Sequence, residues 1–69
     1  MINNLKTIMK LQSVQQKDLA EAIGVTARNV YNWEEGKSTP SVRAGLLISK
    51  YLNIPIDRIF SIEDEIISS

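Results

Sequence analysis

The residues best suited to directional hydrogen bonding lie in the middle of this 69-residue sequence, where Arg28 and Asn32 stand four positions apart. On a helix, that spacing places both side chains on one face. An arginine side chain can donate two parallel hydrogen bonds to guanine, and an asparagine can pair in the same way with adenine. The same residues also occur on ordinary solvated helix surfaces, so what they do depends on the elements that position them.

Side chains that serve catalysis or metal binding are scarce. The sequence contains no histidine and no cysteine. It therefore lacks the commonest general base, the usual zinc ligands and any disulfide. We expect no enzyme activity, no metal site and no small-molecule cofactor.

Charge is spread unevenly along the chain. Residues 1–56 carry seven Lys and Arg against four Asp and Glu, for a net +3, whereas residues 57–69 carry a net −3. The mildly basic body is compatible with nucleic acid, because backbone amides also hold phosphates. No stretch approaches the roughly 18 apolar residues of a membrane helix, and no apolar run of signal-peptide length opens the chain. We expect a cytoplasmic protein with no membrane partner.

Helical periodicity and Gly and Pro boundaries predict five helices in a single all-α domain, residues 1–69. They cover about residues 4–12, 16–24, 27–34, 41–52 and 56–60, with Thr26 as the N-cap of the third. The fourth is expected to turn inward Val42, Gly45, Ile48, Ser49 and Leu52, and the fifth to close the core with Ile56, Ile59 and Phe60. The predicted core is Leu19, Ile23, Val30, Trp33, Ile48, Leu52 and Phe60.

Residues 16–34 have the pattern of a helix-turn-helix. Two short helices that cross steeply need shared apolar positions, which are Leu19, Ile23, Val25, Val30 and Trp33, with the small Ala20 at their approach. Gly24 can adopt a positive φ in the turn between them at no steric cost. A helix-turn-helix places its second helix in the major groove of DNA and lays the first across the backbone.

The sequence resembles the Cro/repressor-type helix-turn-helix domains, the XRE family. The matching segments are QKDLA at 16–20, IGVT at 23–26, VYNWE at 30–34, GKSTP at 36–40, YLNI at 51–54 and residues 59–60. The resemblance covers nearly the whole chain. It implies a five-helix bundle of the lambda-repressor-like type and a transcriptional regulator that binds double-stranded DNA.

The resemblance also assigns roles in DNA contact. It implies that the exposed face of the third helix reads bases through Ala27, Arg28 and Asn32. Contacts to the DNA backbone are implied for Gln16, Lys17, Thr26, Asn29, Tyr31, Lys37, Ser38 and Thr39. Each position has a plainer interpretation as solvated surface. Glu34 is expected to be a structural partner of nearby amides, because its charge would repel phosphate.

Three residues depart from the family pattern. Gln15 stands where a serine or threonine usually caps the second helix, so a looser start is expected. Gly45 takes an inward position usually filled by a larger residue, and we expect it to make room for Trp33. Leu47 stands where a polar residue is usual and is expected to point outward.

The tail, residues 61–69, is open to two interpretations: a short strand or a frayed, charged end. A dimer interface is expected from Leu47, Tyr51, Ile62, Ile66 and Ile67. The hypothesis that these patterns favour is a homodimeric repressor on a palindromic operator. Two alternatives stay open: an antitoxin-type module that also binds a partner protein, and a protein-only adaptor on the same fold.

Overall fold

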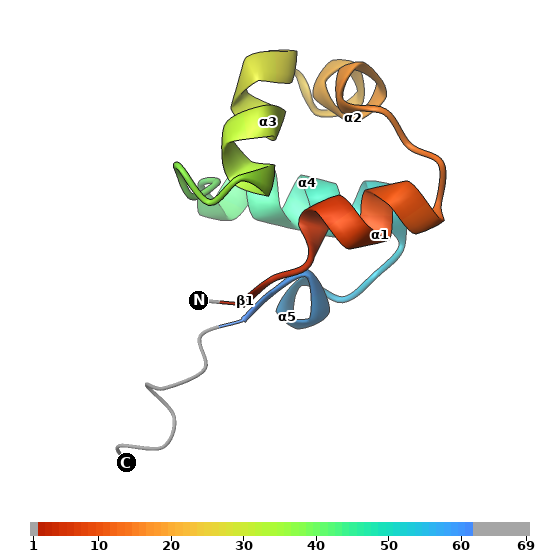
Figure 1. The fold of residues 1–69 in the computed structure, drawn as a ribbon, viewed down its shortest axis with the longest axis vertical. Coiled ribbons are helices and arrows are strands. Elements are labelled where there is room, and N and C mark those ends of the chain that lie inside the picture. The colour runs from red at the N-terminus through yellow and green to blue at the C-terminus, as the bar shows by residue number, and fades with distance from the viewer. Residues whose placement is uncertain (1, 62–69) are drawn as a thin grey trace.

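The computed structural model describes residues 2–61 and places five helices and two short strands in them. The helices are α1 (Leu5–Leu11), α2 (Gln16–Ile23), α3 (Ala27–Glu34), α4 (Val42–Leu52) and α5 (Ile56–Ile59). The strands are β1 (Ile2–Asn3) and β2 (Phe60–Ser61). In Figure 1, α2 and α3 form one end of the molecule, α1 and α4 cross its middle, and α5 lies with β1 at the other end. The predicted all-α, five-helix architecture is confirmed.

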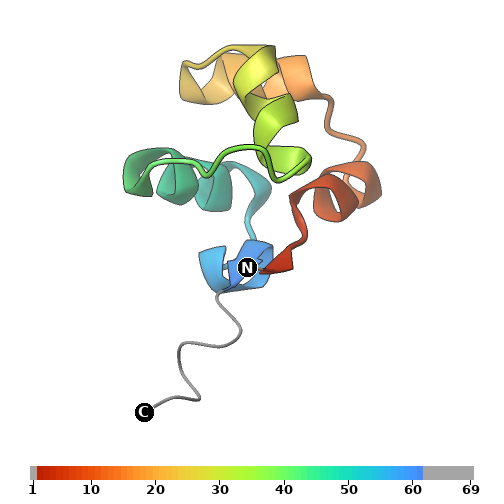
Figure 2. The same ribbon diagram turned by 60° about the vertical axis from the view of Figure 1, so that its left-hand side comes forward.

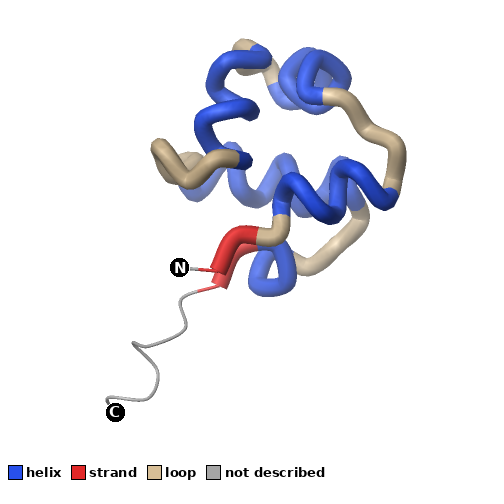
Figure 3. Tube along the Cα trace, in the orientation of Figure 1, coloured by secondary structure: helices blue, strands red, loops and turns tan. Residues whose placement is uncertain are grey.

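The two strands pair with each other and so bring the two ends of the described chain together. β1 pairs antiparallel with β2, with Asn3 opposite Phe60, and Figure 3 shows the two strands side by side. Asn4 extends the pairing, because its backbone amide donates to the Ile59 carbonyl at 2.8 Å and its side-chain amide to the Arg58 carbonyl at 3.0 Å. The strand interpretation of the tail therefore holds for Ser61, its one described residue, which pairs with Ile2 of the same chain. The predicted interface residues Ile62, Ile66 and Ile67 lie outside the described residues.

The core is built from one face of each of the five helices. Its buried members are Leu5, Met9, Leu19, Ala20, Ile23, Val30, Trp33, Ala44, Ile48, Leu52 and Ile59. Six of the seven predicted core residues are among them. Phe60 is the exception, because it is half-buried and packs against the cluster from outside. Ile59, which was expected to close the core, is buried at 0% exposure.

The inward stripe of α4 is shifted from the predicted one. Ala44 and Gly45 face the core together with Ile48 and Leu52, whereas Val42 is 79% exposed. The prediction for Val42 was wrong, because two residues turn a helix by about 200° and the stripe is centred on Ala44. Leu47 was expected to point outward but is half-buried against the core, and the exposed leucine of α4 is Leu46, at 57%.

Gly45 makes room for α5, and its predicted pairing with Trp33 is wrong. A Cβ at position 45 would lie 2.8 Å from Cδ1 of Ile56. The absence of a side chain therefore lets Ile56 lie directly against the backbone of α4. Ile56 itself stays 36% exposed, so it covers this glycine and does not close the core as expected.

Among residues 2–61, no helix is long and apolar enough to cross a membrane.

Candidate nucleic-acid interface

The turn between α2 and α3 is set by Gly24. Its φ of +79° lies in the left-handed region that favours glycine, and the backbone amide of Val25 donates to the Ala20 carbonyl at 2.9 Å. The chain turns within three residues, and Figure 2 shows α3 running at a steep angle to α2. The apolar faces of α2 and α3 are buried together, so the opposite face of α3 is directed to solvent.

Each helix of the motif has a defined start. Thr26 caps α3 as predicted, since its Oγ1 accepts from the backbone amide of Asn29 at 3.2 Å. α2 begins more firmly than expected from Gln15, because the Asp18 carboxylate accepts from the backbone amide of Gln15 at 3.3 Å. This is one of the two hydrogen bonds that make up a capping box, and it satisfies a backbone amide that has no partner within the helix.

The exposed face of α3 carries the predicted base-reading residues. Ala27 and Arg28 are exposed and Asn32 is half-buried, whereas Val30 and Trp33 are buried at 0% and 6% exposure. Burial of those two side chains fixes the rotation of α3 about its axis. Arg28 and Asn32 thus lie on a helix whose position is fixed by its N-cap, by the turn before it and by its buried face.

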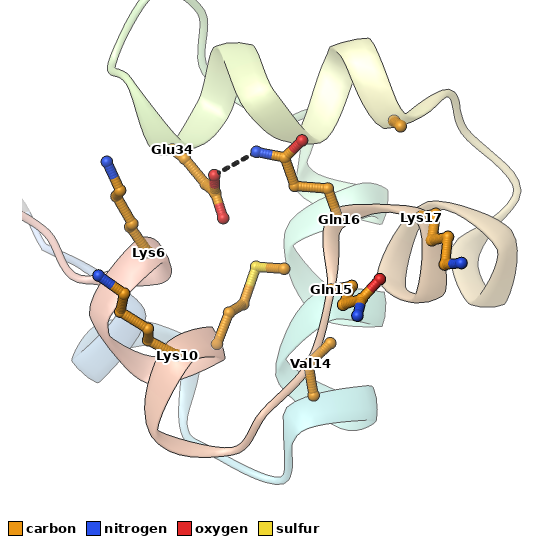
Figure 4. Close-up of a pocket in the computed structure, with 9 residues that line it drawn as sticks. Lys6, Lys10, Val14, Gln15, Gln16, Lys17 and Glu34 are labelled. Atoms are coloured by element: carbon orange, nitrogen blue, oxygen red, sulfur yellow. Dashed lines mark hydrogen bonds between the residues drawn. The ribbon is translucent and has the colours of Figure 1, made fainter.

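A hydrogen bond joins the start of α2 to the end of α3. The side-chain amide of Gln16 donates to a carboxylate oxygen of Glu34 at 2.7 Å, as Figure 4 shows. The expectation that Glu34 partners an amide is confirmed. An amide nitrogen has two hydrogens, so Gln16 keeps a second donor for another acceptor.

A hollow of about 500 Å³ opens beside this hydrogen bond, between α1 and the start of α2. Met9 and Val14 line it together with the long side chains of Lys6, Lys10 and Lys17. In Figure 4, Lys6 and Lys10 rise from α1 on the side of the hollow where Glu34 lies. Sequence reasoning missed both lysines, although their spacing of four residues on one helix face was a visible signal. Lys6 is already paired, with its Nζ 3.4 Å from a carboxylate oxygen of Glu35.

The loop after α3 is folded back onto the helix. Gly36 has a φ of +75°, and the Asn32 carbonyl accepts from the backbone amides of Lys37 at 2.8 Å and Ser38 at 3.4 Å. The side chains of Lys37, Ser38 and Thr39 are exposed. The ammonium of Lys37 lies 5.1 Å from the centre of the Tyr31 ring, a contact that the sequence pattern did not indicate.

The predicted DNA-contacting residues thus gather on α3, on the start of α2 and on the loop that follows α3. Lys17, Thr26 and Asn29 are exposed within this group, and Tyr31 is half-buried. The two described members of the predicted dimer interface, Leu47 and Tyr51, lie on α4 outside it.

Comparison with known proteins agrees with this geometry. The family model described as "Helix-turn-helix" matches residues 5–59. An uncharacterized HTH-type transcriptional regulator of Methanocaldococcus jannaschii is 35% identical over 65 residues, which are 94% of this chain and 98% of that protein. The chain belongs to the helix-turn-helix family of DNA-binding transcriptional regulators, in its Cro/repressor (XRE) type.

Proposed function

We propose that the chain is a sequence-specific regulator that inserts α3 into the major groove of double-stranded DNA. The observation that carries this proposal is the fixed rotation of α3, whose buried Val30 and Trp33 leave Arg28 and Asn32 toward solvent. A helix held in this way enters the groove as a unit. The planar guanidinium of Arg28 suits a guanine edge, and the amide of Asn32 suits adenine. Ala27 is small enough to let the start of α3 approach a thymine methyl.

Contacts to the DNA backbone would surround this helix. We assign them to seven of the eight predicted residues, which are Gln16, Lys17, Thr26, Asn29, Lys37, Ser38 and Thr39. Lys10 joins them, because it lines the hollow beside Gln16. Such contacts hold the protein in register on the duplex without reading its sequence.

We further propose that two copies bind a palindromic operator and repress by occupancy. Supporting this, Val42 and Leu46 stand one turn apart on α4 and are 79% and 57% exposed. Ile56, 36% exposed, lies against Gly45 of that helix, and we group these three exposed apolar side chains as the α4–α5 patch. A second copy that covers this patch would remove these apolar side chains from water. Successive half-sites would lie about 34 Å apart, one turn of DNA.

The deciding experiment is selection of binding sites from a random DNA library, followed by Arg28→Ala on the selected duplex. We expect a loss of about 1–3 kcal/mol on that duplex and a relaxed preference at one base pair per half-site. Arg58→Ala is the matched control, because Arg58 is an exposed arginine on α5, in the part of the molecule away from α3. If Arg28→Ala and Asn32→Ala both retain wild-type affinity and preference, α3 is not the reader.

The dimer has its own test. Leu46→Lys places a charge in the α4–α5 patch without touching the core, so we expect monomers in sedimentation and weaker operator binding. An unchanged oligomeric state in this variant contradicts the patch as the interface. Copurification of a stoichiometric second protein with wild type, lost in Leu46→Lys, would instead favour the antitoxin-type alternative.

A further inference from the structure

Tyr31 holds two cations that the sequence places nine residues apart. The guanidinium carbon of Arg28 lies 5.7 Å from the centre of the Tyr31 ring, and the ammonium of Lys37 lies 5.1 Å from the same centre. Both distances fall within the reach of about 6 Å at which an aromatic face attracts a cation. One ring therefore contacts the side chain assigned to base reading and a side chain assigned to phosphate contact.

The backbone at both Arg28 and Lys37 is fixed by hydrogen bonds, and this places both side chains near the ring. Arg28 lies three residues before Tyr31 on α3, and this spacing puts the two side chains on one helix face. Lys37 returns to the same face because its backbone amide donates to the Asn32 carbonyl. The ring is half-buried, so its own orientation is restricted by neighbouring atoms.

We propose that Tyr31 is a positioning residue for DNA recognition. Its ring holds Arg28 and Lys37 in the orientations from which they meet a base and a phosphate. This inference rests on the proposed function. It adds to that function a residue that orients one base-contacting and one phosphate-contacting side chain. The sequence had assigned Tyr31 to direct contact with the DNA backbone. The geometry points instead to an indirect role through the ring.

The chemistry of the guanidinium makes this role compatible with base reading. All five of its N–H donors lie in the plane of the group. A guanidinium that rests its face on an aromatic ring keeps the donors at its edge free for a guanine. A long side chain that is already oriented loses less freedom on binding, and this lowers the cost of association.

The ring also offsets a repulsion. Arg28 and Lys37 carry like charges and both lie within about 6 Å of the centre of one ring, so their mutual repulsion favours their separation. Attraction to the ring keeps both near the DNA-facing surface of α3 before any phosphate is present. Removal of the ring is therefore expected to disturb both contacts, whereas removal of the hydroxyl leaves them.

Two variants distinguish the effect of the ring from that of the hydroxyl. Tyr31→Leu removes both groups, whereas Tyr31→Phe removes the hydroxyl alone. In the free protein, the ring current of Tyr31 is expected to shift the δ-methylene protons of Arg28 and the ε-methylene protons of Lys37. We expect NMR to show these shifts in wild type and Tyr31→Phe and their loss in Tyr31→Leu. The remaining spectrum reports whether each variant is folded.

Binding is then measured on a duplex recovered by selection with wild type, and on the same duplex altered at the base pair that depends on Arg28. We expect Tyr31→Leu to bind the selected duplex about two- to fivefold more weakly and to discriminate less at that base pair. Tyr31→Phe is expected to rescue both the affinity and the discrimination. A structural role alone would lower affinity for both duplexes equally.

Two results overturn the inference while the proposed function stands. Equal losses in Tyr31→Phe and Tyr31→Leu would show that the hydroxyl makes the contact. Wild-type affinity and discrimination in Tyr31→Leu would show that the ring is unnecessary. Failure of the proposed function looks different, because wild type would then select no DNA sequence even where the ring-current shifts are present.

Discussion

Replacement of Gly45 by alanine is expected to stabilise the protein, although the new methyl group meets another side chain. Gly45 lies inside α4, where alanine is favoured over glycine by about 0.8–1.0 kcal/mol. Against this gain, the added Cβ would stand 2.8 Å from Cδ1 of Ile56. That atom is the flexible end of a side chain that is 36% exposed in the single chain, so in the monomer it can rotate away toward solvent.

The magnitude follows from these two terms. Turning the end of Ile56 toward an off-rotamer position costs about 0.5 kcal/mol, the low end for such distortions. The net stabilisation is therefore about 0.3–0.5 kcal/mol, or a rise in Tm of about 1–4 °C for a domain of this size. Thermal and urea unfolding followed by far-UV circular dichroism measure both quantities. Several protein concentrations are needed, because dimerisation would make Tm depend on concentration.

A double-mutant cycle isolates the contact. Ile56→Val removes the Cδ1 atom, so Gly45→Ala should gain nearly the full 0.8–1.0 kcal/mol or so in that background. A loss of about 1 kcal/mol for Gly45→Ala that persists with Ile56→Val would refute the reasoning. It would mean that the backbone of α4, and not the tip of Ile56, sets the spacing between α4 and α5.

Three further predictions concern the core, the motif and its charge. Leu52 is 1% exposed, so Leu52→Ala should lower the free energy of unfolding by about 2–5 kcal/mol in urea titrations; an unchanged midpoint would contradict its burial. Thr26→Ala removes the cap of α3 and should cost about 0.5–2 kcal/mol, with Thr26→Ser restoring most of it, and equal losses in both variants would argue against the cap. Lys37→Ala should weaken binding to all DNA sequences and reduce the log–log salt slope by about 0.9, whereas Arg58→Ala leaves the slope unchanged; a change of base preference with an intact slope would disprove a phosphate role for Lys37.

The sequence predicted the elements well because local signals define them. Gly24, Thr26 and Pro40 mark the boundaries of helices, and the apolar residues of α2 and α3 recur at helical spacing. These signals were enough to place the helix-turn-helix and the rotation of α3. They were weaker in α4, where the large apolar Val42 is exposed and the small Ala44 is buried. Hydrophobic periodicity gives more weight to the larger side chain, so the predicted stripe shifted.

Contacts between segments far apart in the sequence could not be predicted from local sequence patterns. The side-chain amide of Asn3 donates to the Trp33 carbonyl, and that of Gln12 to the Leu52 carbonyl at 2.8 Å. Neither pair has a spacing that a helix or strand pattern would indicate. The approach of Lys37 to Tyr31 depends on the φ of Gly36 and on the hydrogen bonds of the loop. Such contacts follow from the loop geometry and not from residue type.

The pairing of β1 with β2 gives residues 2–61, the described part of the chain, the topology of a nearly closed ring. Bringing Asn3 opposite Phe60 closes a loop that holds all five helices, at an entropic cost of about 3–4 kcal/mol for its length-dependent part. A covalent backbone junction between the two strands would remove much of that cost from folding, because the unfolded chain would already be circular. The junction would lie at the end of the molecule away from α2, as Figure 1 shows. A backbone-cyclised form is therefore a means to raise stability while the exposed face of α3 stays unaltered.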